Sequence, residues 1–536
     1  MMEELRSARV AAFDAGGAKL PLSRTCDVEG LGENGTAPPE SPSRSLCQSA
    51  SHYVRLSGSF APPALAFAIA LSMALFFSAS AEAALRAGAA TSNITPSMGV
   101  RLDGTIMQIG PAKGIHDELH ARCLVLDDGK ERFAIVVCDN TMIAQFVMDD
   151  AKAIIEKRSG LASNRVLISA THTHSAPRAI GISDEPEDRA YLKFMARRIA
   201  DGVQRAINNL APAEIGWGGA EVPDFVHNRR WFVEGNEKTA NPFGEKGETV
   251  RMNPGRGNLI KPAGPVDKEL FVLSVRHTDG RPMALLANYG LHYIGGIPSG
   301  YVSADYFGVF ADRIQELLEA DRQEPPFVGI MSNGTSGDIN AIDFTAPRKR
   351  FKVYERMTQV GRATAAAALE VYRKIEHRSD LSLGMREVEL PLRIRKPDAA
   401  RLEWAKPLFA SGQVKFDAGK RLTRPEVYAR EAMQLKDYPD VVKIKLQAMR
   451  IGDLGIGSIP CEVFAETGLG IKEKSPMKST FTIELANGFY GYLPTPQQHG
   501  WGGYETWPAR SSCLEVQAEP KIRKAVLGML EELKEK

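Results

Sequence analysis

The chain has 536 residues, 43% of them hydrophobic and 25% charged, and its 67 Lys and Arg nearly balance 65 Asp and Glu. This composition is typical of a globular protein with a large core, and a net charge of +2 argues against recognition of nucleic acid by bulk charge. The chain lacks a glycine period, a sustained heptad and more than one long apolar run, which excludes collagen-like, coiled-coil and polytopic membrane proteins.

The N-terminal region carries features of targeting rather than of a fold. Residues 1–53 are rich in Ser, Gly, Pro and Glu, and we interpret them as a disordered leader or as a start site assigned too far upstream. Residues 54–83 predict a signal peptide, since an apolar core over 64–77, within the uncharged stretch 56–81, is followed by small residues at 78–81, and cleavage is expected after Ala81 or Ala83. The alternative is an uncleaved membrane anchor over 56–81. Both interpretations predict that the remaining chain is exported, either to a periplasm or as a secreted protein.

Residues 84–536 alternate short β-branched runs with amphipathic helical stretches, which predicts one large α/β domain with mixed or parallel sheets flanked by helices. The segment 224–265, rich in Gly, Asn, Pro and charged residues, is expected to be a long irregular loop. The expected strands are 132–138, 165–170, 270–276, 283–288, 327–331, 441–450 and 479–485, and the expected helices are 187–210, 306–320, 357–375 and 520–535.

Polar residues follow several of these predicted strands. The string THTHSAP follows the run RVLISA, and because residues two apart on an extended segment point to the same side, His172 and His174 are expected to face one place. His292 and the segment 332–340 (SNGTSGDIN) follow two further strands. Ligands gather at the carboxyl ends of strands in α/β sheets, so these residues suit a metal or acid/base site. The alternative is a set of hydrogen-bonded core histidines and an ordinary turn.

Seven motifs, ordered along the chain, resemble those of the neutral/alkaline ceramidase superfamily. They are LRAGAATSNITPSMGV, GIHDELHARCLVLDD, ISATHTHSAP, the His292 segment, NGTSGDIN, SIPCEVF and GYLPT with a later YE. The resemblance covers roughly residue 85 to the C-terminus. It implies a zinc-dependent amidase of linear N-acyl bonds, with one Zn²⁺ held by His172, His292, Glu462 and Tyr492.

The resemblance also implies roles for residues around the ion. His174 matches the catalytic acid/base, while Arg229 and Tyr504 match residues close to the substrate. Asn340 stands at the position of the family's serine nucleophile, so we expect zinc-bound water to attack and Asn340 to donate a hydrogen bond to the oxyanion. The alternative is an amidase or esterase that uses Ser336 and forms a covalent acyl intermediate.

A second departure from the family concerns the substrate. Ceramidases of this family usually continue into an immunoglobulin-like domain, which we do not expect here because a charged helix closes the sequence soon after Tyr504. The substrate is therefore either a ceramide-like lipid or another amide or ester, with peripheral membrane contact as one option. A catalytically silent extracellular binding protein on the same scaffold is the alternative function.

Overall fold

The computed structural model describes residues 85–534 except 103–109, 178, 182–185 and 412–421. The described residues all belong to one compact unit. The expected leader and signal peptide lie outside the described residues. No helix in the described part of the chain is long and apolar enough to cross a membrane.

The central element is a mixed eight-stranded sheet. Its two parallel pairs are β14 with β16 and β6 with β7, and the other neighbours are antiparallel. In spatial order the strands are β16 (Val328–Asn333), β14 (Pro282–Tyr289), β13 (Glu269–His277), β8 (Ala211–Glu221), β1 (Arg86–Asn93), β5 (His120–Asp127), β6 (Arg132–Cys138) and β7 (Val166–Ala170).

A second sheet packs against one face of the large sheet. It has four strands, in the order β18 (Leu383–Arg393), β19 (Val441–Ile451), β20 (Leu454–Ile459) and β22 (Ser479–Glu484). One hydrophobic core joins the facing sides of the two sheets: Leu124 and Leu126 of β5 share it with Ile456 of β20 and Phe481 of β22. Successive side chains of a strand point to opposite faces. Accordingly, Cys123 of β5 faces away from the second sheet and belongs to another core.

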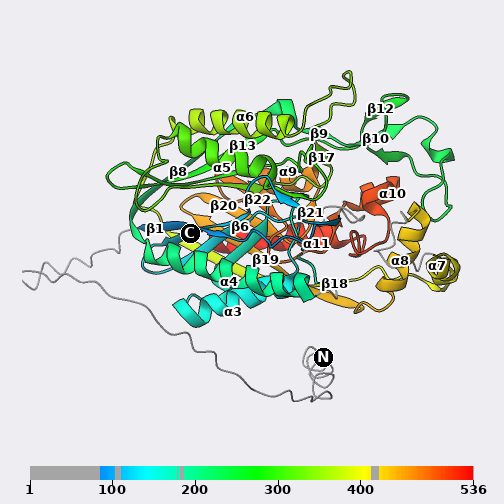
Figure 1. Cartoon of the computed structure of the whole chain (residues 1–536), viewed down its shortest axis with the longest axis horizontal. Coiled ribbons are helices and arrows are strands. Elements are labelled where there is room, and N and C mark those ends of the chain that lie inside the picture. The colour runs from blue at the N-terminus through cyan, green and yellow to red at the C-terminus, as the bar shows by residue number, and fades with distance from the viewer. Residues whose placement is uncertain (1–84, 103–109, 178, 182–185, 412–421, 535–536) are drawn as a thin grey trace, which may run out of the picture. The chain divides into compact units, whose positions relative to one another are not determined.

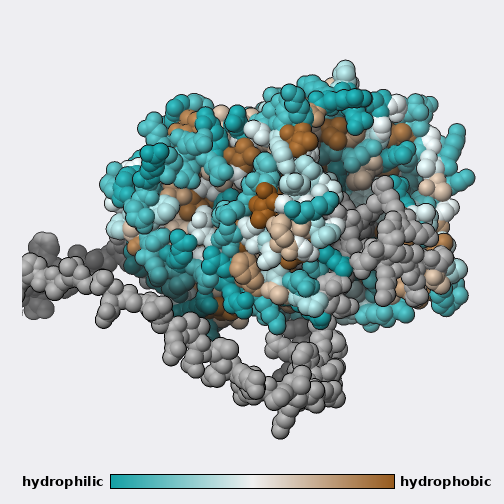
Figure 2. Space-filling model, in the orientation of Figure 1, coloured by the Kyte–Doolittle hydropathy of each residue, from teal (hydrophilic) through white to brown (hydrophobic). Residues whose placement is uncertain are grey.

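Helices cover the outer faces of both sheets, so the fold has four layers (Figure 1). On the large sheet, α5 (Asp305–Leu317) and α6 (Glu355–Tyr372) cover one half, and α3 (Gln145–Ser159) and α4 (Pro186–Asn208) cover the other. The second sheet is covered by α9 (Ala465–Lys474) and α11 (Ala518–Leu533). Away from the sheets, α7 (Ala399–Ser411) packs against α8 (Arg424–Leu435), and α10 is a short helix (Pro496–Trp501). Figure 2 shows a mostly hydrophilic face with separate apolar patches.

The strands and helices expected from the sequence are present, with ends shifted by a few residues. The expectation of an irregular loop over 224–265 is wrong. This segment holds a three-stranded sheet of β11 (Val250–Met252), β10 (Arg230–Val233) and β12 (Leu259–Pro262), and β9 (His227–Asn228), which pairs with β17 (Ile339–Asn340). Strands of two to four residues are too short to show a period of two. The other short pairs are β2 (Arg101–Leu102) with β3 (Gly110–Pro111), β4 (Gly114–Ile115) with β15 (Tyr301–Val302), and β21 (Glu462–Val463) with β23 (Tyr492–Leu493).

Candidate functional site

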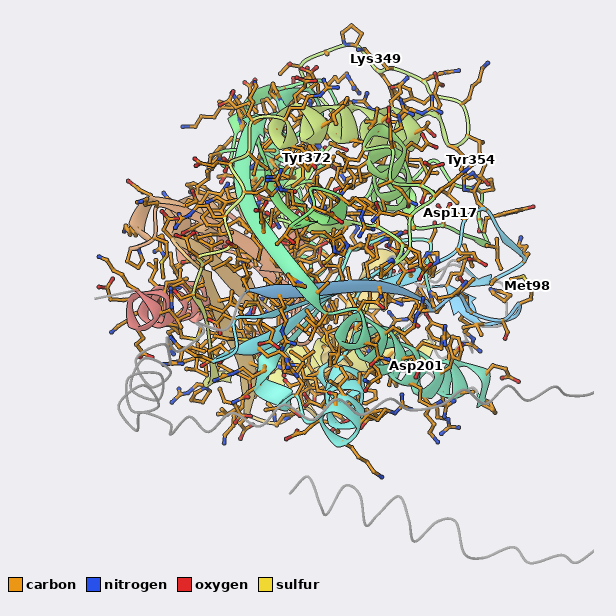
Figure 3. The ribbon with its side chains drawn as sticks, turned by 90° about the vertical axis from the view of Figure 1, so that its left-hand side faces the viewer. Met98, Asp117, Asp201, Lys349, Tyr354 and Tyr372 are labelled. Atoms are coloured by element: carbon orange, nitrogen blue, oxygen red, sulfur yellow. The ribbon has the colours of Figure 1, made fainter. Side chains whose placement is uncertain are left out.

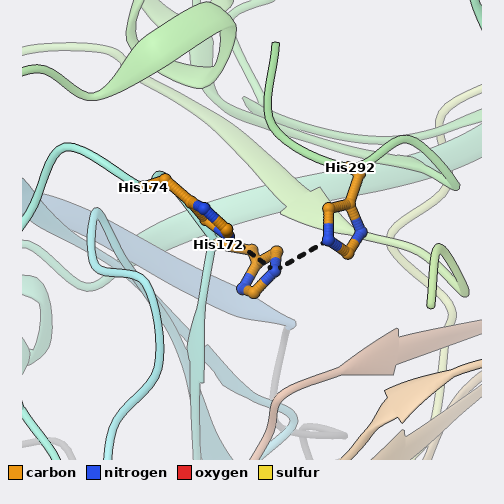
Figure 4. A group of neighbouring side chains, drawn as sticks. All are labelled: His172, His174 and His292. Atoms are coloured by element: carbon orange, nitrogen blue, oxygen red, sulfur yellow. Dashed lines mark hydrogen bonds between the residues drawn. The ribbon is translucent and has the colours of Figure 1, made fainter. Parts of the chain in front are cut away.

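Three histidines meet beyond the ends of β7 and β14. The Nε2 atom of His172 lies 3.0 Å from Nε2 of His292 and 3.1 Å from Nε2 of His174 (Figure 4). In the strand order of the large sheet, β7 and β14 stand near opposite ends. However, β16, the neighbour of β14, lies close to β7, and β22 of the second sheet lies against β7, β14 and β16. The cluster therefore forms where strands of the two sheets converge.

The backbone at His172 explains how its ring reaches this position. Its φ angle is +75°, in the left-handed region that a residue with a side chain seldom adopts, and its N–H donates to the Asn140 carbonyl. His172 and His174 do face one place, as the sequence predicted, but the segment is not extended at His172. A strained backbone of this kind typically marks a functional site, because the surrounding contacts must hold it in place.

The hydrogen bonds of the two buried rings determine where their protons lie. Nδ1 of His172 is 2.8 Å from the Thr141 carbonyl oxygen, and Nδ1 of His292 is 3.0 Å from the Ser336 carbonyl oxygen. A carbonyl only accepts, so each Nδ1 carries a proton and each neutral ring presents a bare lone pair at Nε2. Two such lone pairs 3.0 Å apart repel unless a cation lies against both. This is the pattern of metal-binding histidines, whose other ring nitrogen donates to a carbonyl.

Glu462 lies beside the same two nitrogens. Its Oε2 atom is 3.4 Å from Nε2 of His172 and 3.6 Å from Nε2 of His292, and it accepts no hydrogen bond from any described residue. A buried carboxylate oxygen without a donor is costly unless a cation neutralises it. The pair of β21 with β23 sets Glu462 opposite Tyr492 in the ladder. Two imidazoles, a carboxylate and a phenol form a donor set that fits zinc, so the residues present fit the ion implied by the sequence.

Tyr492 connects this centre to a buried charged group. The guanidinium carbon of Arg229 lies 5.4 Å from the centroid of the Tyr492 ring, and the Tyr504 ring centroid lies 5.8 Å from the same point. Nε of Arg229 donates to Glu505 over 2.9 Å. Burial acts to lower the pKa of Arg229, but Tyr492, Glu505 and Glu462 raise it above its usual value. The guanidinium therefore stays charged although it is buried.

His174 has a second ring contact and an unused nitrogen. Its ring stacks on Tyr293 at 3.5 Å between centroids, and its Nδ1 has no hydrogen-bond partner in the described structure. Burial lowers the pKa of His174 well below its usual value, and the charges of His172 and Arg229 act in the same direction. One nitrogen of each of the three histidines falls within 4.8 Å of the others, so the described rings also allow His174 to be a third nitrogen ligand.

Ser336 and Glu484 lie on the Nδ1 side of His292, opposite the proposed metal position. The Ser336 hydroxyl lies 3.3 Å from Nδ1 of His292, on the side of the ring remote from Nε2, and donates to Oε1 of Glu484 over 2.6 Å. Oε2 of Glu484 accepts from the N–H groups of Val463 (2.7 Å) and Ser336 (3.2 Å). Burial raises the pKa of Glu484 well above its usual value, while these hydrogen bonds act in the opposite direction. Glu484 thus links Ser336, which contacts His292, to Val463, which follows the proposed ligand Glu462.

Asn340 is a predicted site residue whose hydrogen bonds in the described structure go to residues other than the histidines. Its Nδ2 donates to Asn253 over 2.7 Å, and its Oδ1 accepts from the Ile342 N–H over 2.9 Å. Its role as an oxyanion donor stays a prediction, and that role would use the Nδ2 hydrogen that is not donated to Asn253. Sequence reasoning missed Glu484, Glu505 and Tyr293. Glu505 is the acidic residue of the YE motif and Tyr293 follows His292 directly, which was their signal, whereas Glu484 lies outside the motifs and its partners are remote in the chain.

Comparison with known proteins places these observations in a family context. The model of the family "Neutral/alkaline non-lysosomal ceramidase, N-terminal" matches residues 86–343. Neutral ceramidase B of Dictyostelium discoideum is 25% identical over 281 residues, which are 49% of this chain and 36% of that protein, so the match spans about a third of the relative.

Two solved structures share the fold. The crystal structure of neutral ceramidase from Pseudomonas aeruginosa superposes with a TM-score of 0.61 at 19% identity, over 84% of this chain and 74% of that one. A structure described as ceramidase complexed with C2 gives a TM-score of 0.61 at 18% identity, over 84% and 75% of the two chains.

Proposed function

We propose that this chain, which belongs to the neutral/alkaline ceramidase superfamily, is a hydrolase that cleaves an N-acyl amide bond with one zinc ion. The observation that carries the proposal is the pair of bare Nε2 atoms of His172 and His292, 3.0 Å apart, beside the unsatisfied Oε2 of Glu462. A scaffold that only binds a ligand has no need of two rings held in this arrangement. A ceramide-like N-acyl lipid is the first substrate class to test.

The proposed ion and the residues around it have different roles in the proposed hydrolysis. A zinc ion held by His172, His292, Glu462 and Tyr492 would supply Lewis acidity, which would lower the pKa of a water molecule towards about 7 and polarise the scissile carbonyl. Nδ1 of His174 has no hydrogen-bond partner in the described structure, so this ring has a free nitrogen with which to take a proton from the attacking water and pass it to the leaving amine. Arg229 places a fixed positive charge beside Tyr492, where it stabilises negative charge that develops on the substrate oxygen. Tyr504 packs against Tyr492 and shapes the same region.

The experiment that tests this proposal measures metal content and hydrolysis together. The full chain is assayed for bound metal and for cleavage of an N-acyl sphingoid lipid, N-acyl amino acids and matched esters. We expect one zinc per chain and cleavage of at least one amide, both lost in Glu462→Gln. The exposed Glu473→Gln is the matched control and keeps both. Stoichiometric zinc without cleavage of any member of the panel would instead favour a silent binding protein.

Export is a separate proposal that rests on the sequence of residues 54–83. Mass analysis of the protein recovered from cells should show an N-terminus between Glu82 and Leu85. Protein recovered from the cytoplasm with residues 1–53 still attached would contradict it.

A further inference from the structure

The segment that joins β17 to α6 gathers positive charge and exposed apolar side chains. Between Thr345 and Tyr354 the sequence is TAPRKRFKVY, with four basic residues and no acidic one. Residues 347–353 are all exposed. Within this basic segment Phe351 is 40% exposed and Val353 56% exposed. A merely solvated charge run has no need to present large apolar side chains to water.

Contacts at both ends hold this segment against the body of the protein. Arg256 donates from Nε to the Ala346 carbonyl over 2.6 Å, and the Tyr354 N–H donates to the Gly296 carbonyl over 3.1 Å. The Tyr354 ring stacks on His116 at 3.8 Å between centroids. Figure 3 shows Lys349 at the outer edge of the molecule and Tyr354 along one side of it. The anchored ends therefore present the residues between them to solvent.

The neighbouring surface continues the apolar character. Ile115 and Tyr301, on the paired strands β4 and β15, are 44% and 40% exposed, and Ile342, which follows β17, is 44% exposed. We call residues 348–353 with Ile115, Tyr301 and Ile342 the basic rim. The rim adjoins the loop that leads away from His292, since Gly296 of that loop holds Tyr354.

Acidic groups near the rim are engaged by the backbone. Asp117 accepts from the Ala304 N–H, Asp343 from the Thr345 N–H and Glu355 from the Lys352 N–H. Among the described residues, none of these carboxylates contacts the side chains of the four basic residues, and those side chains are exposed to solvent.

We propose that the basic rim docks this chain on an anionic lipid bilayer. Cations attract the negative headgroups, and aliphatic and aromatic side chains between them enter the boundary between headgroups and acyl chains. Nucleic acid or an acidic polypeptide would use the cations but would leave Val353, Ile342 and Ile115 in water. Docking here goes beyond the proposed hydrolysis and does not depend on it, and it brings the bilayer against the loop that leads from His292.

Vesicle binding by the full chain tests the docking proposal without an activity assay. Binding is measured by sedimentation with vesicles of phosphatidylcholine alone and of phosphatidylcholine with phosphatidylglycerol. The rim variant replaces Arg348, Lys349, Arg350 and Lys352 with Ser. Its matched control replaces four exposed basic residues elsewhere, namely Lys157, Lys193, Arg322 and Lys374. A second variant, Phe351→Ser with Val353→Ser, tests the apolar part.

We expect tight binding only to the anionic vesicles, falling as salt is raised. Each basic residue near such a membrane contributes about fivefold in affinity, so the rim variant should bind about 100-fold or more weakly, while the control stays near the wild type. The apolar double variant should also bind more weakly. Equal loss in rim variant and control, or equal binding to both vesicle types, would overturn the proposal. So would binding to soluble polyglutamate or DNA without binding to vesicles, which would assign the rim to an acidic macromolecule.

Discussion

Replacing Ser336 with Ala separates attack by water from attack by serine. The Ser336 hydroxyl is fully buried and lies on the Nδ1 side of His292, whereas the proposed metal lies on the Nε2 side. The substitution removes the 2.6 Å bond to Glu484 and leaves one buried carboxylate oxygen without a donor. We therefore expect a loss of about 1–3 kcal/mol in the free energy of unfolding, with kcat within about tenfold of the wild type.

Chemical denaturation, zinc content and hydrolysis rates on the same preparation measure these effects. Ser332→Ala is the matched control, because Ser332 is also buried and its hydroxyl does not contact the histidines in the described structure. The hydroxyl donates to the Ala287 carbonyl and accepts from Nδ2 of Asn288. A Ser336→Ala variant that is folded, fully loaded with zinc and inactive would contradict attack by water. An acyl group trapped on Ser336 and detected by mass spectrometry would refute it equally.

Four further predictions concern the residues around the site and the histidines beyond it. His174→Ala should lower kcat by about 10²–10⁴ with zinc still bound, because a general acid/base is lost, and rate measurements on the loaded enzyme check this. His292→Ala should remove zinc and activity together, as metal analysis would show. Glu484→Ala should weaken zinc binding by about 10–100-fold in a competitive chelator titration, because the Ser336 and Val463 N–H groups and the Ser336 hydroxyl all lose their acceptor. Burial lowers the pKa of His499 to about 3, so between pH 6.5 and 3 the unfolded chain binds a proton at this residue and the folded chain does not. The free energy of unfolding should therefore decrease as the pH is lowered from 6.5 towards 3, by up to about 1.4 kcal/mol per pH unit. In denaturation curves, His499→Gln should reduce this pH dependence.

The sequence predicted the α/β class but not the stacking of two sheets. Strands β5 and β6 are buried on both faces, so their apolar runs show no alternation that would reveal a second layer on one side. Which face meets another sheet and which meets helices depends on side chains hundreds of residues away, such as Ile456 and Phe481. No local pattern carries that information.

The candidate site was predictable where a motif named its residues. His172, His292 and Glu462 are far apart in the chain. Their positions after predicted strands grouped His172 with His292, and the resemblance added Glu462 as a ligand, before the structure showed their contacts. Glu484 could not be found in this way, because a single Glu in the strand STFTIE has no partner within reach in the sequence. Its role depends on Ser336 and Val463, which tertiary packing brings to it.

The most direct test of the central claim is X-ray absorption at the zinc edge on the purified full chain. We expect one zinc per chain, coordinated only by nitrogen and oxygen at about 2.0–2.2 Å, with two imidazoles in the wild type and loss of the signal in Glu462→Ala. A chain that takes up no zinc, or whose zinc environment is unchanged in Glu462→Ala, would contradict it.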